Sequence, residues 1–256
     1  MSRRGPFAFC LLLLGACQWT SSPSAPAIPD AGTSATSAPV ASAAAPVPAA
    51  APVPEPIPPC RARGGAPLDA ALDYLDEGKY PEGLSCAAQA SALEPDSAAA
   101  HAARGEALAA LNRTTEAQVA YARALAIDPG HPDALLGAAH LYAVQLPSSR
   151  EYDELGALYA ERGLSQPDVS PEMLPRFALV ASMALNDLGR ASDALSRASL
   201  VLAREPNNRE AAYEKALALF ELCRFAEAKA AFSGLVNDAE RGAHAHYHLG
   251  LLLERE

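Results

Sequence analysis

The sequence predicts an all-α protein built from repeated helical hairpins, and three observations support this prediction. From about Ala66 onward the chain is rich in Ala, Leu, Glu and Arg and has no alternating run of β-branched residues, which favours helix. Similar segments return along the chain: ASALEPDSAAA (90–100), ALAIDPGHPDA (124–134) and VLAREPNNREA (201–211). Aligning Pro95 with Pro129 fixes a period of 34 residues, and each recurring proline is expected to end a helix because it cannot continue one.

The first seventeen residues have the pattern of an export signal. Arg3 and Arg4 precede the apolar run 7–14, which is too short to span a bilayer as a helix. The run ends in Leu14-Gly15-Ala16-Cys17, which resembles the bacterial lipobox. This resemblance implies that residues 1–16 are a lipoprotein signal peptide and that Cys17 carries the lipid. It places the protein in the cell envelope, with the outer membrane facing the periplasm as the preferred location.

Residues 17–63 are expected to form a disordered, lipid-anchored linker. Positions 21–59 hold 11 Pro, 12 Ala and 6 Ser, with Asp30 and Glu55 as the only charges. Such a tract has too little apolar surface to offset the entropy lost on ordering, and its prolines remove backbone hydrogen-bond donors.

The 34-residue unit 98–131 contains a recognisable set of packing residues. Gly105, Ala117, Tyr121, Ala124 and Pro129 stand at positions 8, 20, 24, 27 and 32 of the unit. This pattern resembles the tetratricopeptide repeat, in which small residues let two helices approach, an aromatic ring fills the space between units and a proline ends the second helix. The resemblance implies a right-handed superhelical solenoid of helix-turn-helix repeats over residues 64–256.

The same register places the remaining units and their turns. Gly78 and Gly189 are expected in inter-helix turns, an insertion around 147–150 widens the third turn, and Ser97 and Asn208 are expected to cap helices. The predicted units are 64–97, 98–131, 132–167, 170–208 and 209–242, followed by a capping helix at 243–256.

The resemblance also predicts a partner-binding groove lined by the first helix of each unit. The candidate residues are Glu106, Asp133, Leu136, His140, Leu179, Met183, Glu210, Tyr213, Leu217, Phe220 and Tyr247. Their apolar floor and acidic edges suit a peptide with apolar anchors and basic flanks. An alternative is that the protein's own linker covers part of this surface.

No motif in the chain indicates catalysis. The sequence contains no HExxH, GxSxG, CxxC or Walker loop, so neither an enzyme, a cofactor nor a small-molecule substrate is expected. Acid pairs such as Glu210 and Glu214 are expected on exposed helical faces. The net charge of −10, without a basic stripe, argues against a nucleic-acid partner.

The histidines and cysteines near the two ends of the solenoid suggest structural roles. His244, His246 and His248 alternate in one helix; the register places His246 at the aromatic packing position and the other two toward the groove, and no metal site is expected. Cys60 and Cys86 could clip the end of the linker to the first unit, or they could remain unpaired thiols.

These features together predict a non-catalytic scaffold or adaptor, anchored through Cys17, that holds a protein or peptide partner and takes part in assembling an envelope complex. Two alternatives stay open. The protein could be an unanchored periplasmic spacer or oligomerisation protein, or it could regulate a separately encoded envelope enzyme.

Overall fold

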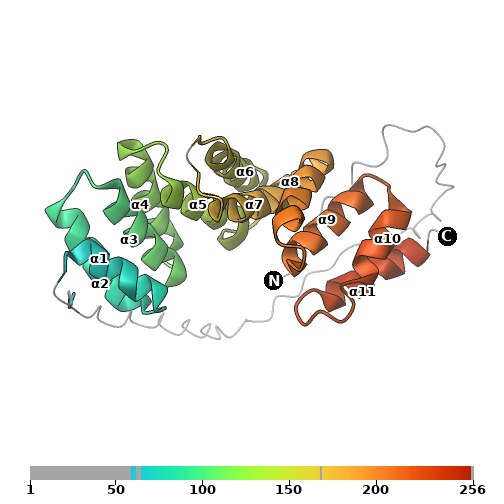
Figure 1. The fold of residues 1–256 in the computed structure, drawn as a ribbon, viewed down its shortest axis with the longest axis horizontal. Coiled ribbons are helices and arrows are strands. Elements are labelled where there is room, and N and C mark those ends of the chain that lie inside the picture. Colours follow the sequence, from blue (N-terminus) through green and yellow to red (C-terminus); the bar gives the residue numbers. More distant parts are fainter. Residues whose placement is uncertain (1–58, 62–64, 168, 255–256) are drawn as a thin grey trace, which may run out of the picture. The chain divides into compact units, whose positions relative to one another are not determined.

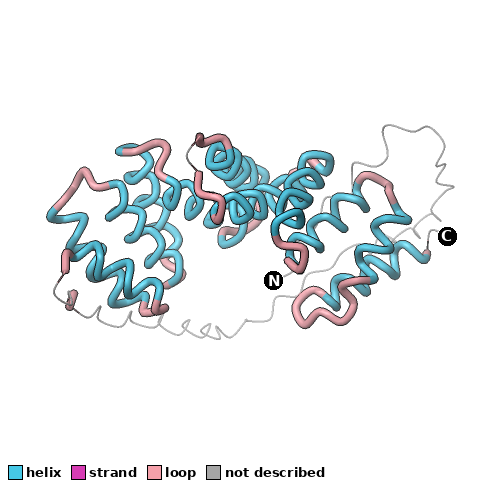
Figure 2. The backbone as a smooth tube through the Cα atoms, viewed as in Figure 1, coloured by secondary structure: helices cyan, strands magenta, loops and turns pink. Residues whose placement is uncertain are grey.

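The computed structural model describes residues 59–61, 65–167 and 169–254 (Figure 1). Within these residues the chain forms helices and turns and no strand, which confirms the all-α prediction (Figure 2). The predicted signal peptide, Cys17 and most of the predicted linker lie outside the described residues.

Eleven α-helices and one π-helical turn follow one another in the described part of the chain. They are α1 (Pro67–Asp76), α2 (Tyr80–Leu93), α3 (Ala98–Ala110), α4 (Thr114–Ile127), α5 (Pro132–His140), η1 (Leu141–Gln145), α6 (Arg150–Leu164), α7 (Met173–Asp187), α8 (Ala191–Arg204), α9 (Arg209–Glu221), α10 (Phe225–Ser233) and α11 (Gly242–Leu253). None of the described helices is both long and apolar enough to cross a membrane.

The helices pack as consecutive pairs. Helix α1 packs on α2, α3 on α4, α5 on α6, α7 on α8 and α9 on α10. Neighbouring pairs are joined through first helices: α3 contacts both α1 and α2, and α5, α7 and α9 repeat this arrangement. Each pair therefore contacts mainly its neighbours in sequence, as in a repeat solenoid.

Four inter-helix turns share one backbone conformation. Gly78, Asn112, Gly189 and Cys223 have φ values of 70°, 60°, 71° and 58°, in the left-handed region. The third turn differs, because α5 continues into the π-helical turn η1 and residues 146–149 precede α6. The insertion predicted at 147–150 is accommodated by this longer connection.

Tyr121 shows why small residues recur in the core. A Cβ atom at Gly105 would lie 2.7 Å from the Tyr121 ring, and one at Gly137 would lie closer still. Gly105 belongs to the same hairpin as Tyr121, whereas Gly137 belongs to the next one. The ring therefore fills the space between neighbouring hairpins, and the glycines provide the room for it.

Two of the described helices begin with the capping residues that the sequence predicts. The side chain of Ser97 accepts a hydrogen bond from the amide of Ala100, and Asn208 accepts one from Ala211, which confirms both caps. His131 and Ser149 cap α5 and α6 in the same way.

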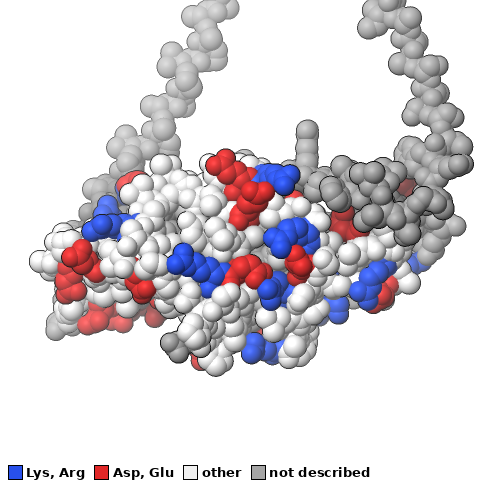
Figure 3. Space-filling model, turned by 90° about the horizontal axis from the view of Figure 1, so that it is seen from above, with Lys and Arg blue, Asp and Glu red and all other residues white. Residues whose placement is uncertain are grey.

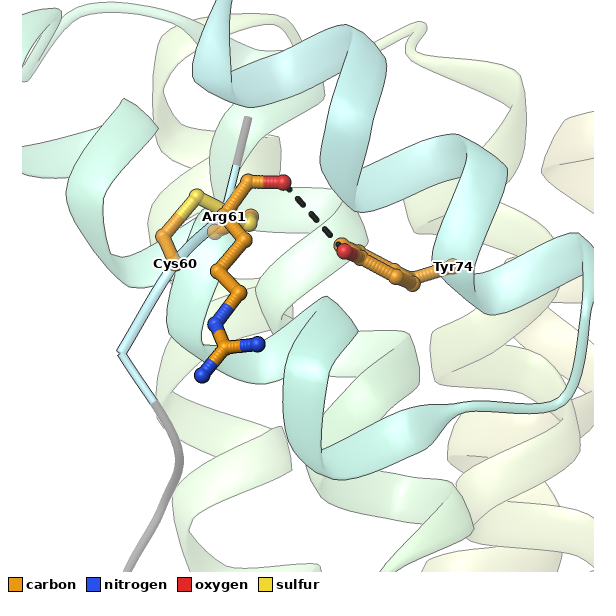
Figure 4. The surroundings of a disulfide bond; sticks show 4 residues. Cys60, Arg61 and Tyr74 are labelled. Atoms are coloured by element: carbon orange, nitrogen blue, oxygen red, sulfur yellow. Dashed lines mark hydrogen bonds between the residues drawn. A yellow bond between two sulfur atoms is a disulfide. The ribbon is translucent and has the colours of Figure 1, made fainter. Parts of the chain in front are cut away.

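A disulfide joins Cys60 to Cys86 (Figure 4). Of the two alternatives left open by the sequence, a disulfide or unpaired thiols, the structure has the disulfide. Cys86 is buried in α2, and Cys60 packs against the same core cluster. The Tyr74 hydroxyl donates a hydrogen bond of 3.2 Å to the carbonyl oxygen of Arg61. The residues preceding α1 are thus attached to the first hairpin at two points.

Candidate binding surface on the first helices

The predicted groove residues all lie on first helices, but their exposure differs. Glu106, Asp133, His140 and Tyr247 are exposed, whereas Leu179, Glu210, Leu217 and Phe220 are partly buried. Leu136, Met183 and Tyr213 each retain an exposed fraction of only 7% and belong mainly to the core. An incoming partner would therefore meet the exposed and partly buried sets first.

The charged members of this surface are close enough to influence one another. Although Glu106 keeps exposed surface, its carboxyl is partly removed from water, which raises its pKa. The carboxylates of Asp133 and Asp76 raise the pKa further, whereas Arg176 opposes the shift. These four residues come from α1, α3, α5 and α7, so successive first helices present side chains to one shared face. Negative charge predominates at this end of the surface.

A second group of residues surrounds Glu210. Its carboxylate forms a short ion pair with Arg241, whose guanidinium also lies 5.4 Å from the centre of the Tyr213 ring. Burial raises the pKa of Tyr213 to about 12. Partial removal of the His140 ring from water lowers its pKa, although the charge of Glu210 acts in the opposite direction.

An aromatic cluster joins α9, α10 and α11. His248 stacks on Phe232 with ring centroids 4.8 Å apart, and it contacts Phe220 at 5.5 Å and Tyr247 at 5.3 Å. Tyr213 meets the Phe232 ring edge-on at 6.0 Å. Tyr247 has an exposed fraction of 55%, so the cluster extends from the core to the surface.

Two expectations about polar residues are wrong. Glu214 does not lie on an exposed face: its exposed fraction is 5%, and it bonds to Asn186 of α7. His248, not His246, occupies the aromatic packing position, and His246 is exposed. Both errors concern depth of burial, which depends on helices from the neighbouring hairpin.

Sequence reasoning missed two contributors to this surface. Arg241 lies in the connection before α11, outside the repeat positions, so the 34-residue period carries no signal for it. Phe225 starts a second helix and meets Phe220 at 6.0 Å.

On the face in Figure 3, basic and acidic side chains lie next to one another without a continuous basic field. Within the described residues, no group of three or more His, Cys, Asp or Glu could hold a metal ion.

Comparisons with known proteins agree with this architecture. Residues 68–143 match the family model described as tetratricopeptide repeat. No curated protein matches the sequence.

Solved structures with the same fold share little sequence with this chain. A tetratricopeptide repeat protein from Parabacteroides merdae is 17% identical with a TM-score of 0.50, and the match covers 68% of this chain and 64% of that one. YrrB, a repeat protein with an unusual peptide-binding site, is 17% identical, with a TM-score of 0.57 and coverages of 71% and 90%. PilW, a type IV pilus biogenesis factor, is 17% identical, with a TM-score of 0.57 and coverages of 74% and 91%. Residues 68–143 thus match the tetratricopeptide repeat family, and the described helices have the fold of a tetratricopeptide repeat solenoid.

Proposed function

We propose that the chain is a non-catalytic adaptor that holds a basic, aromatic-containing peptide segment of a partner protein on its first helices. The solenoid fold serves as a scaffold for protein–protein interaction in general, and the side chains decide which partner is held. The observation that carries the proposal is the sequence of side chains along this surface, from the carboxylates of α1, α3 and α5 to the aromatic cluster of α9–α11.

The acidic end favours a cationic partner. The pKa of Glu106 is raised partly because Asp133 and Asp76 crowd it, so a Lys or Arg placed among them would relieve the repulsion. Such a contact also steers association and weakens as salt screens it.

The aromatic end offers an apolar anchor. Phe220 is partly buried against Phe225 and His248, and Tyr247 lies exposed beside His248. An aromatic or aliphatic side chain that docks here would bury apolar surface that is already held in place, which is the usual arrangement of a hot spot.

The first test uses peptides that combine Lys or Arg with an aromatic residue. Tyr247→Ala is expected to weaken binding by about ten-fold, and the control Tyr80→Ala on α2 by less than about two-fold. Glu106→Gln with Asp133→Asn should weaken binding and reduce its salt dependence. Tyr213 is unsuitable for this test because it is buried, so its replacement by Ala would destabilise the fold before it reported on binding. Equal binding by the Tyr247→Ala and Tyr80→Ala variants would exclude this surface.

We also propose that the adaptor is anchored in the bacterial envelope through a lipid on Cys17. Support comes from the sequence Leu14-Gly15-Ala16-Cys17 and from the Pro/Ala-rich stretch that follows it. PilW, with the same fold, is a pilus biogenesis factor, which is in keeping with an assembly role in the envelope. Cys17→Ala should abolish the uptake of an acyl label and release the protein from membranes. Retention of the label would refute the assignment.

A further inference from the structure

A pocket of about 320 Å³ lies on the first two hairpins, apart from the surface described above. Its apolar lining consists of Pro59, Leu84, Ala88 and Leu108. Arg104 and Leu108 line the pocket from α3. Each of them is two residues away from Glu106, which corresponds to a rotation of about 200° around the helix axis, so they lie on the opposite side of α3 from Glu106. This volume is within the range of small-ligand sites.

The polar lining consists of Ser85, Arg104 and Arg113. The Nε atom of Arg104 is buried and has no hydrogen-bond partner in the described structure. A buried guanidinium N–H without an acceptor is costly, and Nε itself is shielded from the pocket. The terminal nitrogens of the same guanidinium are the donors that a ligand in the pocket would meet. Arg113 already holds Glu116 through bonds of 2.7 and 2.8 Å, which leaves Arg104 as the cation available to a ligand.

Arg104 is not required by the repeat architecture. Steps of 34 residues align it with Ala70 and Ala138. Beyond the longer third connection, the corresponding positions are Ala181 in α7 and Lys215 in α9, which are again 34 residues apart. The three alanines are buried with exposed fractions of 5% or less. By contrast, Arg113 has counterparts with the same role, because Arg190 pairs with Asp193 and Arg224 pairs with Glu227. Helices α1, α5 and α7 thus have alanine at this position, whereas α3 and α9 have a cation there.

The Cys60–Cys86 disulfide positions Pro59, which lines one side of this pocket. Pro59 precedes Cys60 and Ser85 precedes Cys86, so the Cys60–Cys86 bond holds Pro59 next to α2. The result is an apolar pocket with the guanidinium of Arg104 in its lining, closed on one side by a covalent link.

We propose that this pocket binds a carboxylate carried on a short apolar chain. The carboxylate accepts hydrogen bonds from Arg104, while the apolar chain lies against Leu84, Ala88 and Leu108. The same chemistry is presented by a small alkyl carboxylate and by the free C-terminus of an apolar peptide.

The test is a titration of the full-length oxidised protein followed by amide chemical shifts of α2 and α3. Hexanoate and N-acetyl-Ala-Leu are the probes, and hexanamide and the amidated peptide are their neutral controls. We expect binding by one or both acids and not by the amides. Hexanoate alone would assign a small-molecule ligand, whereas the peptide alone would assign a protein C-terminus.

The matched variants use the register of the repeat. Arg104→Ala installs the residue found in three other hairpins, so it is expected to fold and to weaken binding by about ten-fold or more. Lys215→Ala changes the same position in α9 and is expected to alter binding by less than about two-fold. The proposal is overturned if neither acid binds, if the amides bind equally well, or if Arg104→Ala binds like the wild type.

Discussion

At the scale of single residues, Glu214 is a carboxyl group held between two hairpins. The Asn186 amide of α7 donates hydrogen bonds to the Glu214 carbonyl oxygen at 2.9 Å and to its Oε2 at 2.8 Å. Burial raises the pKa of Glu214 to about 7, against the lowering effect of the Asn186 hydrogen bond. The Oδ1 atom of Asn186 is buried and has no partner within the described residues. The neutral carboxyl is therefore the form that suits this site.

This shift predicts a pH dependence of stability. Because the folded-state pKa lies above the ordinary value of 4.5, the contribution is complete below about pH 4.5 and is lost as the pH rises through 7. The upper limit of the loss is roughly 3 kcal/mol. Glu214→Gln should remove this part of the dependence, and the exposed Glu240→Gln should not, as measured by urea unfolding across the pH range.

Comparing the variants separates the contribution of Glu214 to the pH dependence of stability from that of the histidines. Partial removal from water lowers the pKa of His140 and of His248, so both destabilise the fold as the pH falls below 6.5 in every variant. If Glu214→Gln and the wild type keep the same difference in unfolding free energy at all pH values, folding does not shift the pKa of Glu214.

At the scale of elements, the inter-helix turns depend on one left-handed residue each. Glycine stands at two of the four positions, Gly78 and Gly189, and Asn112 occupies the third. Asparagine tolerates this conformation better than most residues, so the pattern follows backbone sterics. The repeat register predicted the turns at Gly78 and Gly189, and only the structure shows that Asn112 and Cys223 adopt the same left-handed conformation.

Alanine at two glycines is expected to have opposite effects. Gly189→Ala should destabilise the protein by about 1–2 kcal/mol, because φ is positive there while no neighbour obstructs a methyl group. Gly250 lies inside α11 with equally open surroundings, so Gly250→Ala should stabilise by about 0.5–1 kcal/mol. Thermal unfolding of both variants tests the pair. Equal effects would mean that α11 is not helical at Gly250 or that the turn relaxes.

At the scale of the whole molecule, each hairpin is stabilised mainly by the hairpins beside it. In such a stack, stability is close to a sum of local terms, and the hairpin at an edge has a neighbour on one side only. The first described hairpin, α1 with α2, has the Cys60–Cys86 bond and the Tyr74 hydrogen bond in addition to its packing on α3.

Removal of this disulfide should therefore have a local effect. Cys60→Ala with Cys86→Ala is expected to cost about 3–4 kcal/mol for a loop of 26 residues. Hydrogen exchange should accelerate in α1 and α2 and change little in α9–α11. Uniform acceleration along the chain would show that the solenoid unfolds as a single cooperative unit.

How far the candidate surface could be predicted also depends on neighbours. The period of 34 assigned all eleven candidate residues to first helices, since a period determines the face of a helix. It could not assign depth, which is why Tyr213 and Met183 proved to be buried and why Arg241 was missed. Residues 234–241 form an irregular connection that separates α11 from the regular repeats. The repeat register therefore did not identify His248, instead of His246, as the histidine that packs on Phe232.

The sequence by itself determined the helical class, the length of the repeat, the capping residues and the presence of a lipobox-like Cys17, because these depend on local propensity and on short motifs. Only the tertiary structure decided that Cys60 pairs with Cys86, that Glu214 is buried against Asn186 and that Arg104 lacks a partner beside an apolar pocket. These outcomes arise from side chains of adjacent hairpins, whose approach depends on packing that no single repeat encodes.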